Sequence, residues 1–201
     1  MMRSNNIRDF EFQTESAAID PQMDLTTRAV LLSILFRETD RVQRMKTPLC
    51  LILLGIDDVG HRNLRLGGKV CDDLLCQVVG RVARILRSYD VPGRFGKDEI
   101  LVMLPGCSAS DAMMLAERLS VDVFDEPFQV AGEVIRLSAC FGITSSEGRS
   151  PIVVLKEAEQ ALRNAKNAGP GSIACFGKVA QDQQPCSPLL WSSSKDESLG
   201  W

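Results

Sequence analysis

The spacing of apolar residues in the first half of the chain changes from one segment to the next. Between residues 28 and 46 the apolar residues recur at helical spacing, and Pro48 follows as a stop signal, so a helix is predicted there. Residues 49–56 form an unbroken apolar run, which is typical of a short strand buried on both faces. Helical spacing returns from Val70 to about Tyr89 and predicts a second, longer helix.

The second half of the chain begins with a predicted hairpin that has an acidic tip. Two short extended segments, residues 94–95 and 100–104, flank a polar turn led by Gly96. Ser108 follows as an N-cap residue for the next helix. The remaining predicted elements are a helix over 109–121, a strand over 134–143, a helix over 152–168 and a strand over 172–176.

The order of these elements predicts the fold class. Helix, strand, helix, hairpin, helix, strand, helix and strand together form split βαβ units, so we expect an α/β (α+β) fold with a ferredoxin-like central sheet surrounded by helices. Residues 1–19 are polar and without clear period, and we expect a flexible N-terminal arm. Residues 178–201 are rich in Gln, Ser and Pro and are predicted to be a disordered tail, which leaves residues 20–177 as the domain.

Composition narrows the classes of function. The chain has 23 Lys and Arg against 26 Asp and Glu, a net charge of −3, which is too balanced for a nucleic-acid-binding surface. The longest apolar run, residues 49–56, is far shorter than the roughly 20 residues that span a bilayer. No apolar stretch follows the N-terminal methionines, so no signal peptide is predicted. We therefore expect a cytoplasmic protein with no membrane span and no nucleic-acid partner.

The cysteines and the histidine of this chain do not predict a disulfide framework, a metal site or a catalytic centre. The seven cysteines are odd in number and include no Cys-x-x-Cys pair, so they are interpreted as reduced, small hydrophobic residues. His61 is the only histidine, and a lone loop histidine is usually a solvated surface group. A His-rich zinc site or a Ser-His-Asp centre is therefore not predicted.

The hairpin carries a sequence signature. Residues 94–100 read RFGKDEI and resemble the RYGGDEF signature of the GGDEF domain, the catalytic module of diguanylate cyclases. Other blocks agree with that family in order and spacing: DPQMDLTTR at 20–28, AER at 116–118, FG at 141–142 and ALRNAK at 161–166. The resemblance covers residues 20–176 and implies an adenylyl-cyclase-palm-like form of the predicted fold.

The resemblance also implies a catalytic centre that this sequence keeps only in part. Two GGDEF domains, each holding GTP, condense two nucleotides into cyclic di-GMP with divalent ions on the phosphates. The family's metal ligands align with Gly55 and Asp98, so the first carboxylate is missing and metal binding at Asp98 is expected to be weak or lost. Asp98 and Glu99 then form a catalytic remnant. Asp57 lies two residues, about 6.6 Å, beyond Gly55, too far to replace its carboxylate without remodelling.

Other positions of the implied phosphate site differ as well. Gly60 and Pro170 stand where the family has a lysine and an arginine, whereas Lys166 is retained. Lys97 replaces the second glycine of the turn, where the backbone must approach the triphosphate. An alternative is that Lys97 acts as a fixed cation in place of a metal ion.

The guanine pocket is better preserved. Asn63 and Asp72 align with the residues that read the base in the family, and with Lys166 they form the expected GTP-binding set. An amide and a carboxylate suit the donor and acceptor edge of guanine. The alternative, equally open, is that Asn63 is a turn residue and Asp72 a favourable charge in a helix's first turn.

A third feature ends the second predicted helix. Residues 87–90 read RSYD and match the family's RxxD inhibitory site for cyclic di-GMP, while Arg118 matches a second arginine of that site. Guanidinium groups form bidentate hydrogen bonds to phosphate and stack on guanine, and the carboxylate of Asp90 can accept hydrogen bonds from the edge of the base. The alternative is a weak surface ion pair between Arg87 and Asp90.

Three functions are compatible with these residues. The favoured hypothesis is a degenerate GGDEF domain that binds cyclic di-GMP through Arg87, Asp90 and Arg118 without making it, and that needs no cofactor. The second is a diguanylate cyclase of low or unusual metal dependence, which would use Mg²⁺. The third is a protein-interaction module without a nucleotide. GTP binding, a homodimer and a protein partner remain open.

Overall fold

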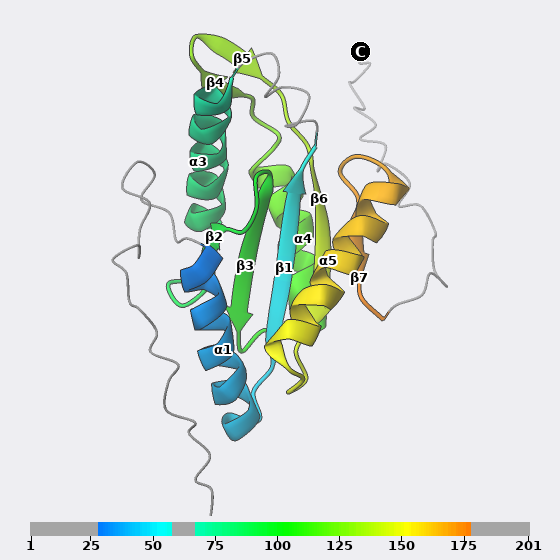
Figure 1. Ribbon diagram of the computed structural model, residues 1–201. Helices are drawn as coiled ribbons and strands as arrows, with labels where there is room; N and C mark the ends of the chain where they lie inside the picture. The colour runs from blue at the N-terminus through cyan, green and yellow to red at the C-terminus, as the bar shows by residue number, and fades with distance from the viewer. Residues whose placement is uncertain (1–27, 58–66, 178–201) are drawn as a thin grey trace, which may run out of the picture.

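The computed structural model describes residues 28–57 and 67–177, which form a sheet with helices on both faces (Figure 1). The central sheet has five strands in the order β2-β3-β1-β6-β7, and two further strands pair separately. In chain order the elements are α1 (Arg28–Met45), β1 (Leu49–Ile56), α3 (Gly68–Ile85), β2 (Val91–Arg94), β3 (Glu99–Pro105), α4 (Ala109–Asp122), β4 (Phe128–Val130), β5 (Glu133–Ile135), β6 (Ala139–Ser145), α5 (Pro151–Ala168) and β7 (Ile173–Cys175).

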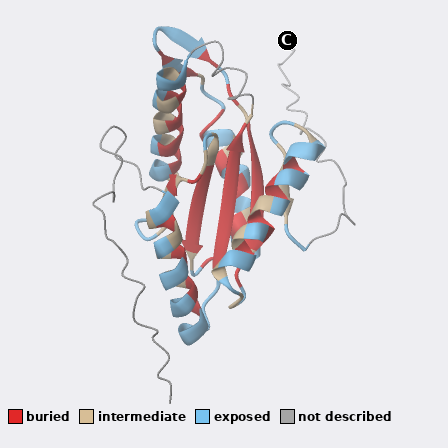
Figure 2. Cartoon of the chain, viewed as in Figure 1, coloured by how far each residue is buried: buried red, intermediate tan, exposed pale blue. Residues whose placement is uncertain are grey.

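Strand β1 is the middle of the sheet. It pairs antiparallel with β3 on one side and with β6 on the other, and β7 adds to β6 in parallel. Every residue of β1 is buried, as the unbroken apolar run predicted, and Figure 2 shows the middle strands of the central sheet, β1, β3 and β6, in the colour of buried residues. The predicted α/β class with a ferredoxin-like sheet surrounded by helices is confirmed.

Successive residues of β1 enter two different cores. Side chains alternate between the two faces of a strand, so Ile52 and Leu54 pack with α3 and α4, whereas Leu51 and Leu53 pack with α1 and α5. Gly55 continues the second series and therefore faces α5. Because of this alternation, α5 is the helix that covers Gly55, next to the predicted catalytic remnant at Asp98 and Glu99.

Helix α5 packs unusually close to β6, and Gly142 is the reason. A Cβ atom on Gly142 would overlap the backbone nitrogen of Leu162 and would lie 2.6 Å from the carbonyl oxygen of Ala158. Because backbone cannot give way as a side-chain tip can, only glycine fits there. The FG block at 141–142 thereby fixes α5 against the sheet.

Most predicted elements agree with the structure, but the second helix ends earlier than expected. Helix α3 ends at Ile85 rather than near Tyr89, and Leu86 is already extended. A carboxylate oxygen of Asp90 accepts the backbone N–H of Arg87 at 2.9 Å, a local bond that competes with further helix. Strand β2 then begins at Val91, and Pro92 fits because β2 lies at the edge of the sheet.

The strand predicted over residues 134–143 is in fact two strands in two sheets. Ala131 and Gly132, both with positive φ, turn the chain between β4 and β5, and these short strands pair only with each other. β6 begins afresh at Ala139 and continues to Ser145 in the central sheet. The break was concealed because alternate residues on both sides of it, among them Ile135, Leu137 and Ala139, pack on the same core.

The helix cap at Ser108 is confirmed, since its hydroxyl oxygen accepts the backbone N–H of Asp111 at 3.2 Å. Both predicted terminal segments, residues 1–19 and 178–201, lie outside the described residues. In the part of the chain that the structure describes, none of the helices is long and apolar enough to cross a membrane.

Candidate functional site

The hairpin turn between β2 and β3 lies beside the end of β1. The backbone N–H groups of Phe95 and Gly96 donate to the carbonyl of Glu99 at 2.9 and 3.1 Å and close the turn. The N–H of Ile56 donates to the carbonyl of Asp98 at 2.9 Å, and Gly55 pairs with Glu99 in the β1–β3 register. Asp98 and Glu99, the predicted catalytic remnant, therefore adjoin Gly55, where the resemblance places the family's first carboxylate.

Lys166, from the last turn of α5, reaches this turn. Its Nζ lies 3.7 Å from Oδ2 of Asp98, and the two side chains are 37% and 36% exposed. A Cβ atom on Gly55 would lie 2.7 Å from Cε of Lys166 and 3.0 Å from Nζ, so the lysine stem crosses directly over Gly55. Lys97 is exposed. The structure thus places Lys166, retained from the predicted GTP-binding set, against Asp98.

Glu99 is the less solvated of the two acidic residues of the turn. Burial raises the pKa of its carboxyl, the nearby Lys166 ammonium opposes the rise, and the charge of Asp98 adds to it. Residues 28–57 and 67–177 contain no group of three or more His, Cys, Asp or Glu side chains placed to hold a metal ion. Because Mg²⁺ requires near-octahedral oxygen ligation, the described residues of this turn do not fit the metal site of the family.

The carboxylate of Asp57 is bonded to residues on the β6 side of β1. Its carboxylate accepts the hydroxyl of Ser138 at 2.6 Å, the backbone N–H of Gly171 at 3.2 Å and the thiol of Cys140 at 3.3 Å. These partners lie on β6 and the segments next to it, whereas Asp98 belongs to the hairpin on the opposite side of β1. The carboxylate of Asp57 is therefore directed to these partners and away from Asp98.

Asp72, the predicted guanine-reading carboxylate, is tied to the same hairpin. Its Oδ1 lies 3.0 Å from Nη1 of Arg94, whose Nε donates to the carbonyl of Gly96 at 3.1 Å. This pairing joins the N-terminal part of α3 to the turn that carries Asp98. Asn63, the other predicted base-reading residue, lies outside the described residues.

The RxxD segment forms a turn between α3 and β2. Asp90 accepts the backbone N–H of Arg87 with its carboxylate and donates its own N–H to the carbonyl of Arg87 at 3.0 Å. The guanidinium of Arg87 instead donates to the hydroxyl of Tyr89 at 3.0 Å, which raises its pKa further above the usual range. Among the described residues, the guanidinium of Arg87 forms no ion pair with the carboxylate of Asp90. The structure therefore does not contain the weak surface ion pair considered as the alternative.

Arg118 completes this second cluster from helix α4. Its Nη2 donates at 2.9 Å to the carbonyl of Ile85, one of the acceptors that a helix end leaves unpaired. A cavity of about 280 Å³ lies between the end of α3 and α4, and its lining includes Arg87, Asp90 and Arg118. The structure therefore brings the three predicted residues to one cavity.

Several residues of both clusters escaped the sequence-based expectations. Cys107, Asp111 and Met114 also line the cavity, and Tyr89 holds the guanidinium of Arg87. The helical spacing of Asp111, Met114 and Arg118 was the available signal, because residues three and four apart share a helix face. No signal in the sequence pointed to Arg94 as the partner of Asp72.

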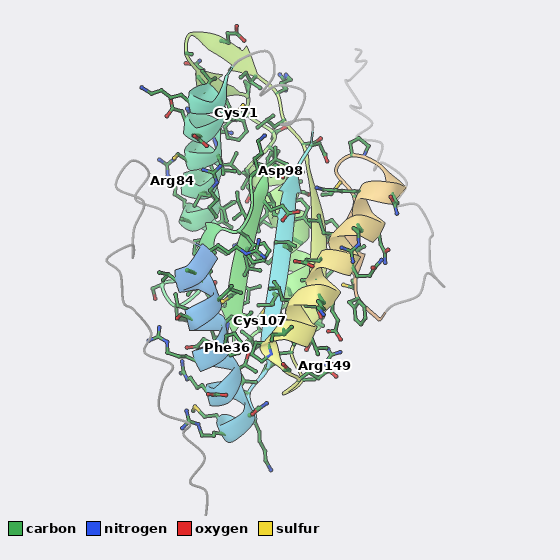
Figure 3. The ribbon with its side chains drawn as sticks, viewed as in Figure 1. Phe36, Cys71, Arg84, Asp98, Cys107 and Arg149 are labelled. Carbon is green, nitrogen blue, oxygen red and sulfur yellow. The ribbon has the colours of Figure 1, made fainter. Side chains whose placement is uncertain are left out.

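The two clusters lie at opposite ends of β3. The catalytic turn precedes Glu99, whereas Leu104 lines the cavity. At roughly 3.3 Å per residue, the distance from Glu99 to Leu104 along the strand is about 16 Å. Figure 3 shows Asp98 near one end of the sheet and Cys107 near the other.

The mixed sheet, the helices on its two faces and the acidic hairpin beside the central strand form the palm-like fold of solved GGDEF domains. The family model for "Diguanylate cyclase, GGDEF domain" matches residues 17–172, and the chain belongs to this family.

Comparison with individual proteins agrees with that family. Diguanylate cyclase DgcP of Pseudomonas aeruginosa is 35% identical over 160 residues, which cover 79% of this chain and 24% of DgcP. Response regulator PleD of Caulobacter vibrioides is 28% identical over 176 residues, which cover 86% of this chain and 38% of PleD. The chain thus spans well under half the length of these relatives. The GGDEF domain of DgcB from Caulobacter crescentus, solved in complex with c-di-GMP, shares the fold with a TM-score of 0.74 at 22% identity, covering 81% of this chain and 97% of that one.

Proposed function

We propose that this GGDEF domain is a receptor for cyclic di-GMP that no longer synthesises it. The observation that carries the proposal is the cavity that Arg87, Asp90 and Arg118 line together, with the guanidinium of Arg87 exposed to solvent. The family's role in cyclic di-GMP signalling supports the choice of ligand.

The chemistry of the three side chains suits this ligand. Cyclic di-GMP offers two phosphates and two guanines, and each arginine can pair with a phosphate or stack on a base plane. Tyr89 and the carbonyl of Ile85 hold the two guanidinium groups in place through one donor each, which leaves further donors for the ligand. Charge-assisted bonds contribute about 1.5 to 3 kcal/mol each, so a few of them reach the ~8 kcal/mol of a micromolar complex.

Loss of synthesis is proposed from the other end of β3. Gly55 supplies no carboxylate, and Asp98 is paired with Lys166. Asp72 is paired with Arg94, so GTP bound in the family's manner would compete with two internal ion pairs. Residual GTP binding through Asp72 and Lys166 is part of the proposal, whereas Mg²⁺ is needed only if turnover survives.

The alternative is a weakly active diguanylate cyclase. It is favoured by the retained Asp98 and Glu99 and by the activity for which DgcP is named. In that case two domains would each present GTP, and a homodimer would be required for turnover.

Calorimetry and product analysis separate the two functions. Titration of cyclic di-GMP into the protein in EDTA should give micromolar binding that Mg²⁺ does not change. Chromatography after incubation with GTP and either Mg²⁺ or Mn²⁺ should show no cyclic di-GMP, and Gly55→Asp should not restore it. Robust formation of cyclic di-GMP by the unmodified chain would show that it is a cyclase. If titration with cyclic di-GMP gives no binding heat, the receptor function is wrong and the third hypothesis, a protein-interaction module, is favoured.

A further inference from the structure

Gly55, Asp98 and Lys166 meet at the catalytic remnant, although they come from β1, the hairpin and α5. We infer that the ammonium group of Lys166 takes the place of the family's divalent cation beside Asp98, so that the turn is neutralised from within the chain and does not recruit Mg²⁺. This inference does not depend on the receptor function, which concerns the cavity at the other end of β3.

The first support is steric. The stem of Lys166 occupies the space that any side chain at position 55 would enter, since a Cβ there would lie 2.7 Å from Cε and 3.2 Å from Cδ2 of Leu162. A lysine tip can move, but it would have to leave its position over β1 to do so. Glycine at 55 therefore removes a metal ligand and at the same time admits the lysine.

The second support is the fixed position of the lysine backbone. Leu162 and Ala165 are buried against the sheet, and Gly142 holds this part of α5 at backbone contact. The N–H of Gly169 donates to the carbonyl of Lys166 at 3.3 Å and ends the helix there. Because α5 cannot rotate without losing this packing, the Cα of Lys166 has a fixed position, from which the side chain reaches Asp98.

The third support is the balance of charge. A divalent ion at Asp98 would have to share that carboxylate with the Lys166 ammonium, whose Nζ already lies 3.7 Å from Oδ2 of Asp98. Ammonium is a compact cation that satisfies a carboxylate without the six oxygen ligands of Mg²⁺.

Manganese binding tests the inference without nucleotide or turnover. Free Mn²⁺ is measured by electron paramagnetic resonance during titration of the full chain and its variants. The unmodified protein should show only millimolar binding, and Lys166→Ala should tighten it at least tenfold by exposing Asp98. Adding Asp98→Asn to Lys166→Ala should abolish the gain.

Lys97→Ala is the matched control, because it removes one positive charge beside Asp98 without emptying the space over Gly55, which Lys166 occupies. It should change Mn²⁺ affinity less than threefold. Equal gains from Lys97→Ala and Lys166→Ala would mean that net charge alone matters, and the assignment to Lys166 would be wrong. Micromolar Mn²⁺ binding by the unmodified chain, lost in Asp98→Asn, would also overturn it.

Gly55→Ala tests the steric half. The added methyl displaces the Lys166 stem, so Mn²⁺ affinity should rise, by a smaller factor than in Lys166→Ala. An unchanged affinity in Gly55→Ala would refute the idea that glycine is needed to admit the lysine. If Lys166→Ala does not fold, Lys166→Met keeps the stem and removes the charge, and it should still tighten Mn²⁺ binding more than Lys97→Met.

Discussion

The two ends of β3 hold the same kinds of side chain in opposite arrangements. At the catalytic turn, Asp98 is paired with Lys166 and Asp72 with Arg94, so acidic groups are satisfied by cations of the chain. At the RxxD turn, the carboxylate of Asp90 bonds to backbone, and the guanidinium of Arg87 remains exposed beside a cavity. Internal pairing consumes the charges that would hold a ligand, whereas backbone anchoring leaves them available. The proposed loss of catalysis and the proposed binding of cyclic di-GMP are thus compatible in one domain.

The largest expected effect comes from the packing that places Lys166. Gly142→Ala should lower the free energy of unfolding by about 3 kcal/mol, because the new methyl meets helix backbone. Gly80→Ala is the matched control, since an added Cβ on this exposed residue of α3 meets nothing within 4 Å. It should stabilise the chain by about 0.5 to 1 kcal/mol. Urea denaturation measures both; equal effects would contradict the close approach of α5.

Removing the exposed guanidinium should produce the next largest effect. Arg87→Ala is expected to weaken cyclic di-GMP binding about tenfold or more, roughly 1.4 kcal/mol, and Arg87→Lys should recover little because ammonium lacks the planar fork. Arg84→Ala is the control: Arg84 is exposed on α3 but is not part of the cavity lining. If calorimetry shows that Arg84→Ala and Arg87→Ala weaken cyclic di-GMP binding equally, the ligand responds only to net positive charge and the site assignment is wrong.

A smaller effect should appear in the pH dependence of stability. Because burial raises the folded-state pKa of Glu99, the unfolded chain ionises first as pH increases. The stability of the unmodified protein should therefore include a loss that begins near the ordinary pKa of 4.5 and is complete above the raised folded-state pKa. Glu99→Gln should remove that loss and be the more stable variant at pH 7. Chemical denaturation from pH 4 to 8 measures this, and a variant that is less stable at pH 7 would contradict the direction.

The smallest effect is expected at the remnant carboxylate. Asp98→Ala should leave the dissociation constant of cyclic di-GMP within about twofold, since Asp98 lies at the other end of β3 from the cavity. Calorimetry under the same conditions as for Arg87→Ala gives the comparison. If Asp98→Ala abolishes binding and Arg87→Ala does not, cyclic di-GMP occupies the old catalytic turn.

Local patterns were sufficient for most elements of this fold. The apolar run of β1, the periodicity of α1 and α5 and the cap at Ser108 all depend on residues close in sequence, and each prediction was confirmed. The errors arose where the backbone departed from the pattern. Asp90 ended α3 early, and the predicted strand over 134–143 is interrupted between Ile135, the end of β5, and Ala139, the start of β6.

Sequence by itself therefore determined the family, the absence of a carboxylate at Gly55 and the presence of the RxxD residues. Only the tertiary structure decided what fills the space over Gly55 and how Arg87 and Asp90 are oriented. The physical reason is that composition and periodicity report contacts between near neighbours in the chain. The meeting of Lys166 with Asp98 depends instead on how closely α5 packs on the sheet, and that distance follows from backbone contact at Gly142.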